Sequence, residues 1–165
     1  MKIDETAAAY GLFHAHFAWL ADRLASALFY LQQRRDPSVT FEPLTGRPFG
    51  QNLRDFEAAL KKFPDSLAVQ IGLDACTKMR EVSNWRNERV HARVDFDQHA
   101  MTLALYSWRT RERLAISPEE IQQKIARASE LVFAVNSTLE HVLHQLDFDK
   151  MMADIFSEID TTKLD

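Results

Sequence analysis

The sequence predicts an all-α fold, an up-down helical bundle of four to five helices. Apolar residues recur at spacings of three and four over long stretches, which is the period of an amphipathic helix. The 165 residues include only four glycines and five prolines, too few for the many turns of a β fold. A hydrophobic share of 46% is enough for a packed core. We therefore expect a single helical domain over residues 1–165.

The first half of the chain predicts two helices separated by a loop. An apolar stripe runs over about Asp4–Arg35, and Pro37 should end this helix because proline disfavours helix in the residue before it. Residues 37–50 contain three prolines and two glycines, which is typical of a loop. A short helix is expected over about Asn52–Lys62, with the asparagine as its N-cap.

A long helix is expected next, over about Leu67–His91, with Asp65 or Ser66 as its cap. The face that should point inward becomes polar near the end, where Arg86 and Arg89 follow the apolar residues. That change predicts a cleft or an interface at this end of the helix. The expected inner stripe is Leu67, Ile71, Ala75, Met79 and Val82.

The last third of the chain predicts a small excursion and then a helix. Residues 94–116 are rich in β-forming residues and favour a small β-hairpin. Ser117-Pro118-Glu119-Glu120 is a strong helix start, with serine at the N-cap, proline at N1 and glutamate at N3. The helix should continue to about Leu146, and a separate short amphipathic helix is expected over residues 147–159.

The chemistry is concentrated in the stretch Arg86-Asn87-Glu88-Arg89-Val90-His91. A guanidinium can hold phosphate oxygens in a fork, and an imidazole can move a proton near neutral pH. Asn87 and His91 are four residues apart and share one face of a helix. These groups are suited to a phosphodiester, and Arg89, Arg93 and Lys78 are expected to bind its flanking phosphates.

Arg86, Asn87 and His91 resemble the signature of the HEPN superfamily, in which an arginine, often followed by asparagine, precedes a histidine by four to six residues. The resemblance implies a helical bundle that forms a homodimer and cleaves RNA without a metal or another cofactor. It assigns catalysis to Arg86, His91 and Asn87, in a toxin or defence system whose partner is an antitoxin or a nucleotidyltransferase. Other HEPN members are non-catalytic binding or regulatory modules, so that alternative stays open, as does a structural helical dimer with no nucleic-acid role.

Other kinds of site are weaker. Glu88 and His91 form a Glu-x-x-His pair, but a di-iron bundle needs a second pair that this sequence lacks. The histidines at 14, 16, 141 and 144 are more typical of surface or half-buried positions than of a zinc site. Cys76 is the only cysteine, so no internal disulfide is expected and the cytoplasm is the expected location. No apolar run is long enough to span a membrane, and the net charge of −4 limits nucleic-acid contact to a local patch.

Overall fold

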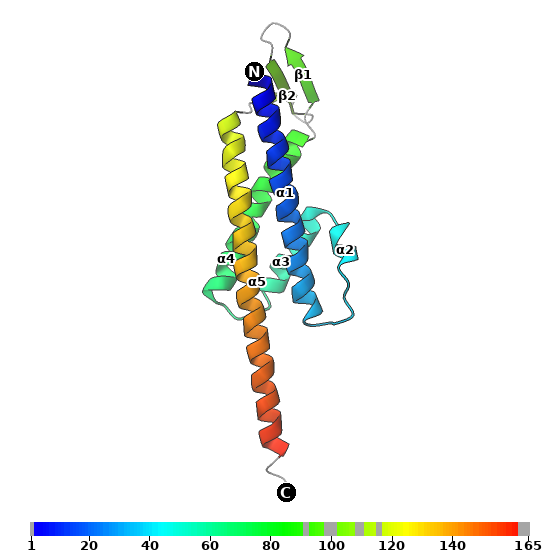
Figure 1. The fold of residues 1–165 in the computed structure, drawn as a ribbon, viewed down its shortest axis with the longest axis vertical. Helices are drawn as coiled ribbons and strands as arrows, with labels where there is room; N and C mark the ends of the chain where they lie inside the picture. Colours follow the sequence, from blue (N-terminus) through cyan, green and yellow to red (C-terminus); the bar gives the residue numbers. More distant parts are fainter. Residues whose placement is uncertain (1, 91–92, 98–101, 108–110, 115–116, 162–165) are drawn as a thin grey trace.

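The computed structural model describes residues 2–90, 93–97, 102–107, 111–114 and 117–161. Within them the chain forms five helices and one small three-stranded sheet, so the predicted all-α helical bundle is confirmed (Figure 1). The helices are α1 (Lys2–Gln33), α2 (Glu42–Thr45), α3 (Phe49–Leu60), α4 (Leu67–Val90) and α5 (Pro118–Thr161). No helix of the described residues is both long enough and apolar enough to cross a membrane.

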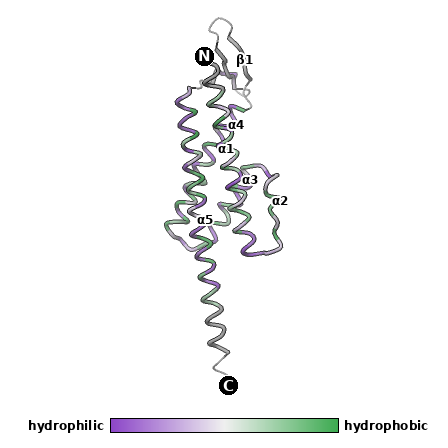
Figure 2. Tube along the Cα trace, viewed as in Figure 1, coloured by the Kyte–Doolittle hydropathy of each residue, from purple (hydrophilic) through white to green (hydrophobic). Residues whose placement is uncertain are grey.

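α1 and α5 lie side by side and run in the same direction (Figure 1). His16 Nδ1 lies 2.9 Å from Ser129 Oγ, and Arg34 pairs with Asp147 at 3.2 Å. The two residues of each pair are 113 positions apart in the sequence, so the offset between the two parallel helices is constant. Purple and green alternate along both helices in Figure 2, as expected for amphipathic helices whose apolar sides face each other.

α4 packs on α5 and runs in the opposite direction. Thr138 Oγ1 of α5 donates to the carbonyl of Ala68 near the start of α4, while Glu120 at the start of α5 reaches Trp85 near its end. Gly72 allows the close approach: an added Cβ would lie 2.6 Å from a Thr138 methyl and 2.7 Å from Leu60. The α4–α5 seam thus depends on a residue without a side chain.

The connection between α1 and α3 returns the chain along the bundle, so that α3 runs parallel to α1. The ring of Phe49, at the start of α3, lies 4.9 Å from the ring of Phe17, whereas Arg35 lies over Phe63 beyond the end of α3. The segment expected to be a loop, residues 37–50, is partly helical, because it contains α2. Asn52, the expected N-cap, is instead buried inside α3, where it donates to the carbonyl of Leu44 at 2.9 Å.

Two further expectations are wrong in detail. Leu67 and Ile71, placed on the inner stripe of α4, are 74% and 45% exposed. The break expected after Leu146 does not occur, since no proline or glycine interrupts the segment and α5 continues to Thr161. The end of α5 extends past the bundle, and Phe148 there is half exposed.

The predicted hairpin lies at one end of the bundle, beside the start of α1 (Figure 1). Strands β1 (Arg93–Asp97) and β2 (Thr102–Tyr106) pair antiparallel with Arg93 opposite Tyr106, and β3 (Arg113–Leu114) adds to the other edge of β2. The sheet therefore follows directly after the helix end that carries the arginine–asparagine motif.

Candidate functional site

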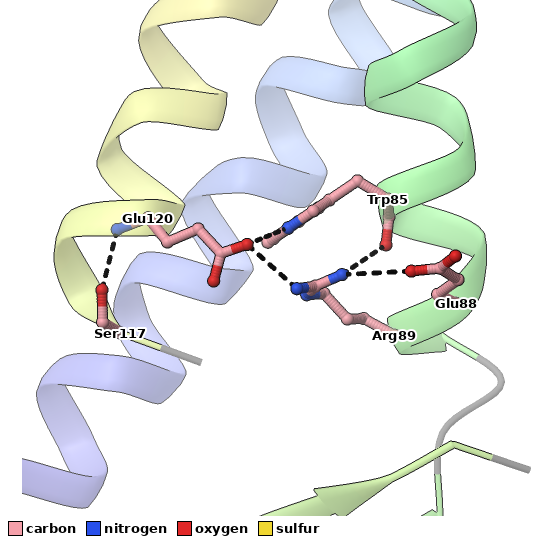
Figure 3. Close-up of polar contacts among 5 residues, drawn as sticks. All are labelled: Trp85, Glu88, Arg89, Ser117 and Glu120. Carbon is pink, nitrogen blue, oxygen red and sulfur yellow. Dashed lines mark hydrogen bonds and ion pairs between the residues drawn. The ribbon is translucent and has the colours of Figure 1, made fainter. Parts of the chain in front are cut away.

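The end of α4 is held against the start of α5 by one carboxylate (Figure 3). Glu120 Oε1 accepts hydrogen bonds from the Trp85 indole at 2.5 Å and from Arg89 Nη2 at 2.9 Å. The Arg89 guanidinium also lies 4.1 Å over the Trp85 ring and donates to the Trp85 carbonyl at 3.3 Å. With a side chain only 9% exposed, Arg89 is part of the packing.

The helix cap predicted at Ser117 places Glu120 for this role. Ser117 Oγ accepts a hydrogen bond from the Glu120 backbone amide at 3.0 Å, as the N-cap of α5 should. In a full capping box the N3 glutamate would return to the N-cap amide. Here its side chain crosses to α4 instead, where it holds Trp85 and Arg89 and so fixes the helix turn that contains Arg86 and Asn87.

Arg86 is held in place without a carboxylate. Its guanidinium lies 5.1 Å from the centroid of the Phe17 ring, and Nη1 donates to Asn87 Oδ1 at 3.1 Å. Its Nε is buried and has no hydrogen-bond partner within the described residues. A guanidinium fixed by an aromatic ring and a neutral amide keeps its positive charge available for an anion.

Arg86 and Asn87 line a cleft of about 440 Å³ between α1, α3 and α4, which we call the arginine cleft. Three of its residues are arginines, and no aspartate or glutamate is among the residues that line it. The polar residues of α4 in the cleft recur at helical spacing and form one stripe. The lining residues are Phe17, Pro48, Phe49, Gly50, Leu53, Arg54, Arg80, Ser83, Asn84, Arg86 and Asn87.

The three arginines of the cleft differ in how far their charge is neutralised. Arg80 forms an ion pair with Glu57, whose carboxyl pKa is lowered chiefly by its hydrogen bond to Lys61 and also by Arg80. Arg54 makes no hydrogen bond or ion pair within the part of the chain described here. Among the described residues, the Arg86 guanidinium contacts two neutral groups, the Asn87 amide and the Phe17 ring. The cleft therefore carries a positive charge contributed mainly by Arg54 and Arg86.

Two titratable groups of α1 lie near Arg86. Burial lowers the pKa of the His14 imidazole below its ordinary value, and the nearby positive charge of Arg86 lowers it further. Burial raises the pKa of the Tyr10 hydroxyl, against the opposing effect of Arg86 and Arg89. Their rings meet edge to face at 4.7 Å. His14, which is half-buried, thus lies within electrostatic reach of the candidate catalytic arginine.

The structure brings together only part of the predicted site. Arg86 and Asn87 share the cleft, whereas His91 lies outside the described residues and Arg93 belongs to β1, with a side chain that is not described. Lys78 pairs with Asp74 on the surface of α4 and does not line the cleft. Arg89 was expected to bind substrate, and this is corrected because Glu120 and Trp85 occupy its guanidinium.

Sequence reasoning missed Arg54, Asn84 and the two phenylalanines of the cleft. A usable signal existed on α4, where Arg80, Asn84 and Asn87 follow helical spacing. No signal indicated Arg54, since its role depends on how α3 packs against α4.

Other candidate chemistry is not supported by the geometry. Cys76 is fully buried, and burial raises the pKa of its thiol to about 12. No group of three or more histidine, cysteine, aspartate or glutamate side chains suited to a metal ion occurs within the described ranges.

No family model matches this chain, and neither a curated protein nor a solved structure matches it. The HEPN resemblance consequently rests on the sequence motif of Arg86, Asn87 and His91 and on the place of Arg86 and Asn87 near the end of α4.

Proposed function

We propose that the protein is a metal-independent endoribonuclease of HEPN type that grips RNA in the arginine cleft. The observation that carries the proposal is the state of Arg86: its guanidinium is fixed by Phe17 and Asn87, has no carboxylate partner among the residues that the structure describes, and faces a cleft whose described lining holds no acid. Such a group suits the phosphate of a nucleic acid, where charge-assisted, forked hydrogen bonds form.

In this mechanism the 2′-hydroxyl of RNA attacks the adjacent phosphorus and the 5′-oxygen leaves, so no metal-bound water is needed. Arg86 holds the phosphate and stabilises the negative charge that grows on its oxygens. Asn87, which already bonds to Arg86, orients the guanidinium. His91, as the resemblance implies, takes the proton of the 2′-hydroxyl or supplies the proton of the leaving oxygen.

The test is cleavage of a labelled single-stranded RNA by purified protein in EDTA. Wild type should cleave it, and Arg86→Ala or His91→Ala alone should remove nearly all activity, since residues that act as one unit are strongly non-additive. Arg86→Lys should restore little activity, because lysine keeps the positive charge but cannot form the two parallel hydrogen bonds of a guanidinium. Arg23→Ala is the matched control: this exposed arginine of α1 does not line the cleft and should retain full activity. Intact RNA after hours with wild type would end the catalytic proposal.

A second candidate is a non-catalytic RNA-binding module of the same family type. One observation favours it: none of the described residues that line the cleft has a side chain that transfers protons near neutral pH. Under this alternative Arg86→Ala weakens RNA binding, while wild type leaves RNA intact and His91→Ala binds as wild type does.

We also propose that the protein forms a homodimer, and that an antitoxin or nucleotidyltransferase is its cellular partner. The exposed apolar side chains include two aromatic residues beside the α1–α5 seam. Trp19 is 38% and Phe133 is 68% exposed, beside the His16–Ser129 contact of that seam. We therefore place the proposed interface on α1 and α5, leaving the cleft between α1, α3 and α4 open to RNA.

A further inference from the structure

We propose that Arg54 forms a second phosphate subsite in the arginine cleft, so that the protein binds two phosphates of one RNA strand, the first at Arg86 and the second at Arg54. This inference rests on the proposed binding of RNA in the cleft. It gives a phosphate-binding role to Arg54, which lies on α3 and not on the motif helix α4. It also requires an RNA strand with at least two phosphates.

The first argument is that the cleft has two cationic walls. Arg86 belongs to α4 and Arg54 to α3, and both line the same cavity of about 440 Å³. That volume is within the range of pockets that hold a small organic ligand such as a nucleotide. A single phosphate needs only one guanidinium fork, whereas guanidinium groups on two walls suit successive phosphates of a strand.

The second argument is that Arg54 is free to bind. The neighbouring Arg47 is occupied by Asp55, and Arg80 is occupied by Glu57. Arg54 is exposed and has no ion pair or hydrogen bond within the described residues. Its charge therefore remains available to an anion in the cleft.

The third argument is an aromatic surface in the cleft beside Arg86. The Phe49 ring of α3 packs 4.9 Å from the Phe17 ring, which in turn lies under Arg86. Phe49 is half-buried and lines the cleft, so part of its ring remains accessible. A base between two bound phosphates can stack on such a ring without sequence preference.

The experiment compares binding of two probes in EDTA, measured in the His91→Ala background so that no RNA is cleaved. One probe is a dinucleoside monophosphate, with one phosphate, and the other is a trinucleoside diphosphate, with two. Arg54→Gln should weaken the two-phosphate probe roughly tenfold and leave the one-phosphate probe unchanged. With a longer single strand, the slope of log K against log salt should fall by about 0.7, the value of one phosphate contact.

Arg23→Gln is the matched control, because it removes the same charge from an exposed site outside the cleft and should change neither probe. Equal binding of the two-phosphate probe by Arg54→Gln and its parent would overturn the subsite. An equal loss on both probes would also overturn it, since Arg54 would then belong to a single phosphate site.

The failures of the two proposals are distinguishable. If wild type cleaves RNA and Arg54→Gln binds both probes normally, only the subsite fails. If wild type binds with the expected difference between the probes but never cleaves, the subsite stands and the catalytic proposal fails. If neither probe binds, the subsite fails, and the catalytic proposal fails with it only when wild type also leaves RNA intact.

Discussion

Arg89 and Glu120 join the end of α4 to the start of α5 through a charge-assisted hydrogen bond of 2.9 Å. The Arg89 side chain is 9% exposed and that of Glu120 is 33% exposed, so the pair is partly shielded from water. Because Arg86 lies one turn before Arg89 on the same helix, this contact also fixes the position of the candidate catalytic arginine.

Arg89→Met should lower the free energy of unfolding by about 1–3 kcal/mol, because the Glu120 carboxylate and the Trp85 indole lose a shared partner while the apolar stem is kept. Urea denaturation at neutral pH measures this. Arg127→Met is the control, since it breaks the exposed Arg127–Glu130 pair and should cost less than about 0.5 kcal/mol. Similar losses for the two variants would show that the α4–α5 contact does not stabilise the fold.

Two glycines in helix interiors should respond oppositely to alanine. Gly11→Ala should stabilise the protein by about 0.5–1 kcal/mol, because the new Cβ meets nothing within 4 Å and the unfolded chain loses freedom. Gly72→Ala should destabilise it by about 1–3 kcal/mol, since the Cβ would lie 2.6 Å from the Thr138 methyl.

Thr138→Ser tests the cause of the Gly72 effect, because it removes that methyl and keeps the hydroxyl that donates to Ala68. Added to Gly72→Ala, it should recover part of the lost stability in thermal unfolding. If Gly72→Ala raises the melting temperature as Gly11→Ala does, the close packing of α4 on α5 is wrong.

The helices could be predicted because their signals are local. The apolar period marks each long helix, and the Ser117 cap is visible in four residues and is confirmed by its bond to the Glu120 amide. The buried face of α4 was predicted correctly at Ala75, Met79 and Val82, and was misjudged only in the first turns, where Gly72 has no hydrophobic side chain to mark it. Leu67 and Ile71 were more apolar, and they were chosen although they face solvent.

The cleft could be predicted only in part. Arg86 and Asn87 belong to a local motif, so sequence spacing identifies them. Arg54 and Phe49 join them through the packing of α3, and the chain that positions α3 was expected to be a loop as far as residue 50. The role of Arg89 could not be predicted from local sequence, because Glu120, the glutamate that binds its guanidinium, is 31 residues away in the sequence.

The proposed dimer makes a direct prediction at the α1–α5 seam. Phe133→Glu should convert a dimer to a monomer, because it buries a charge in an apolar interface. The side chain is 68% exposed in one chain, so the monomer's own thermal stability should change little. Light scattering at micromolar concentration measures the mass, with exposed Gln33→Glu as the control for added charge. Wild type with the mass of one chain would rule out the dimer.

Cys76 should be inert in the native protein. Its thiol is fully buried, and burial raises its pKa to about 12, so the thiolate that reacts with disulfide reagents is scarce at pH 8. An aromatic disulfide reagent should react at the rate of unfolding in buffer and at once in denaturant. Fast reaction in buffer would reveal an accessible thiol and would contradict its burial.

The stability of the protein should depend on His14 below about pH 6.5. Burial, with a further contribution from Arg86, holds the pKa of His14 below its ordinary value of 6.5 in the folded chain. Between the two pKa values the unfolded chain binds more protons, so the free energy of unfolding falls as the pH drops through this window. Above pH 6.5 His14 is neutral in both states and its contribution is fully present.

His14→Gln should therefore flatten the decline of unfolding free energy between neutral pH and the folded pKa, as measured by urea denaturation at a series of pH values. Arg86→Gln should raise the pKa of His14 toward its ordinary value, because it removes the nearby positive charge. An NMR titration of the His14 ring, assigned by its loss in His14→Gln, measures that change separately from stability. If the Arg86→Gln titration coincides with that of wild type, the guanidinium does not act on the imidazole, and Arg86 and His14 do not share one electrostatic site.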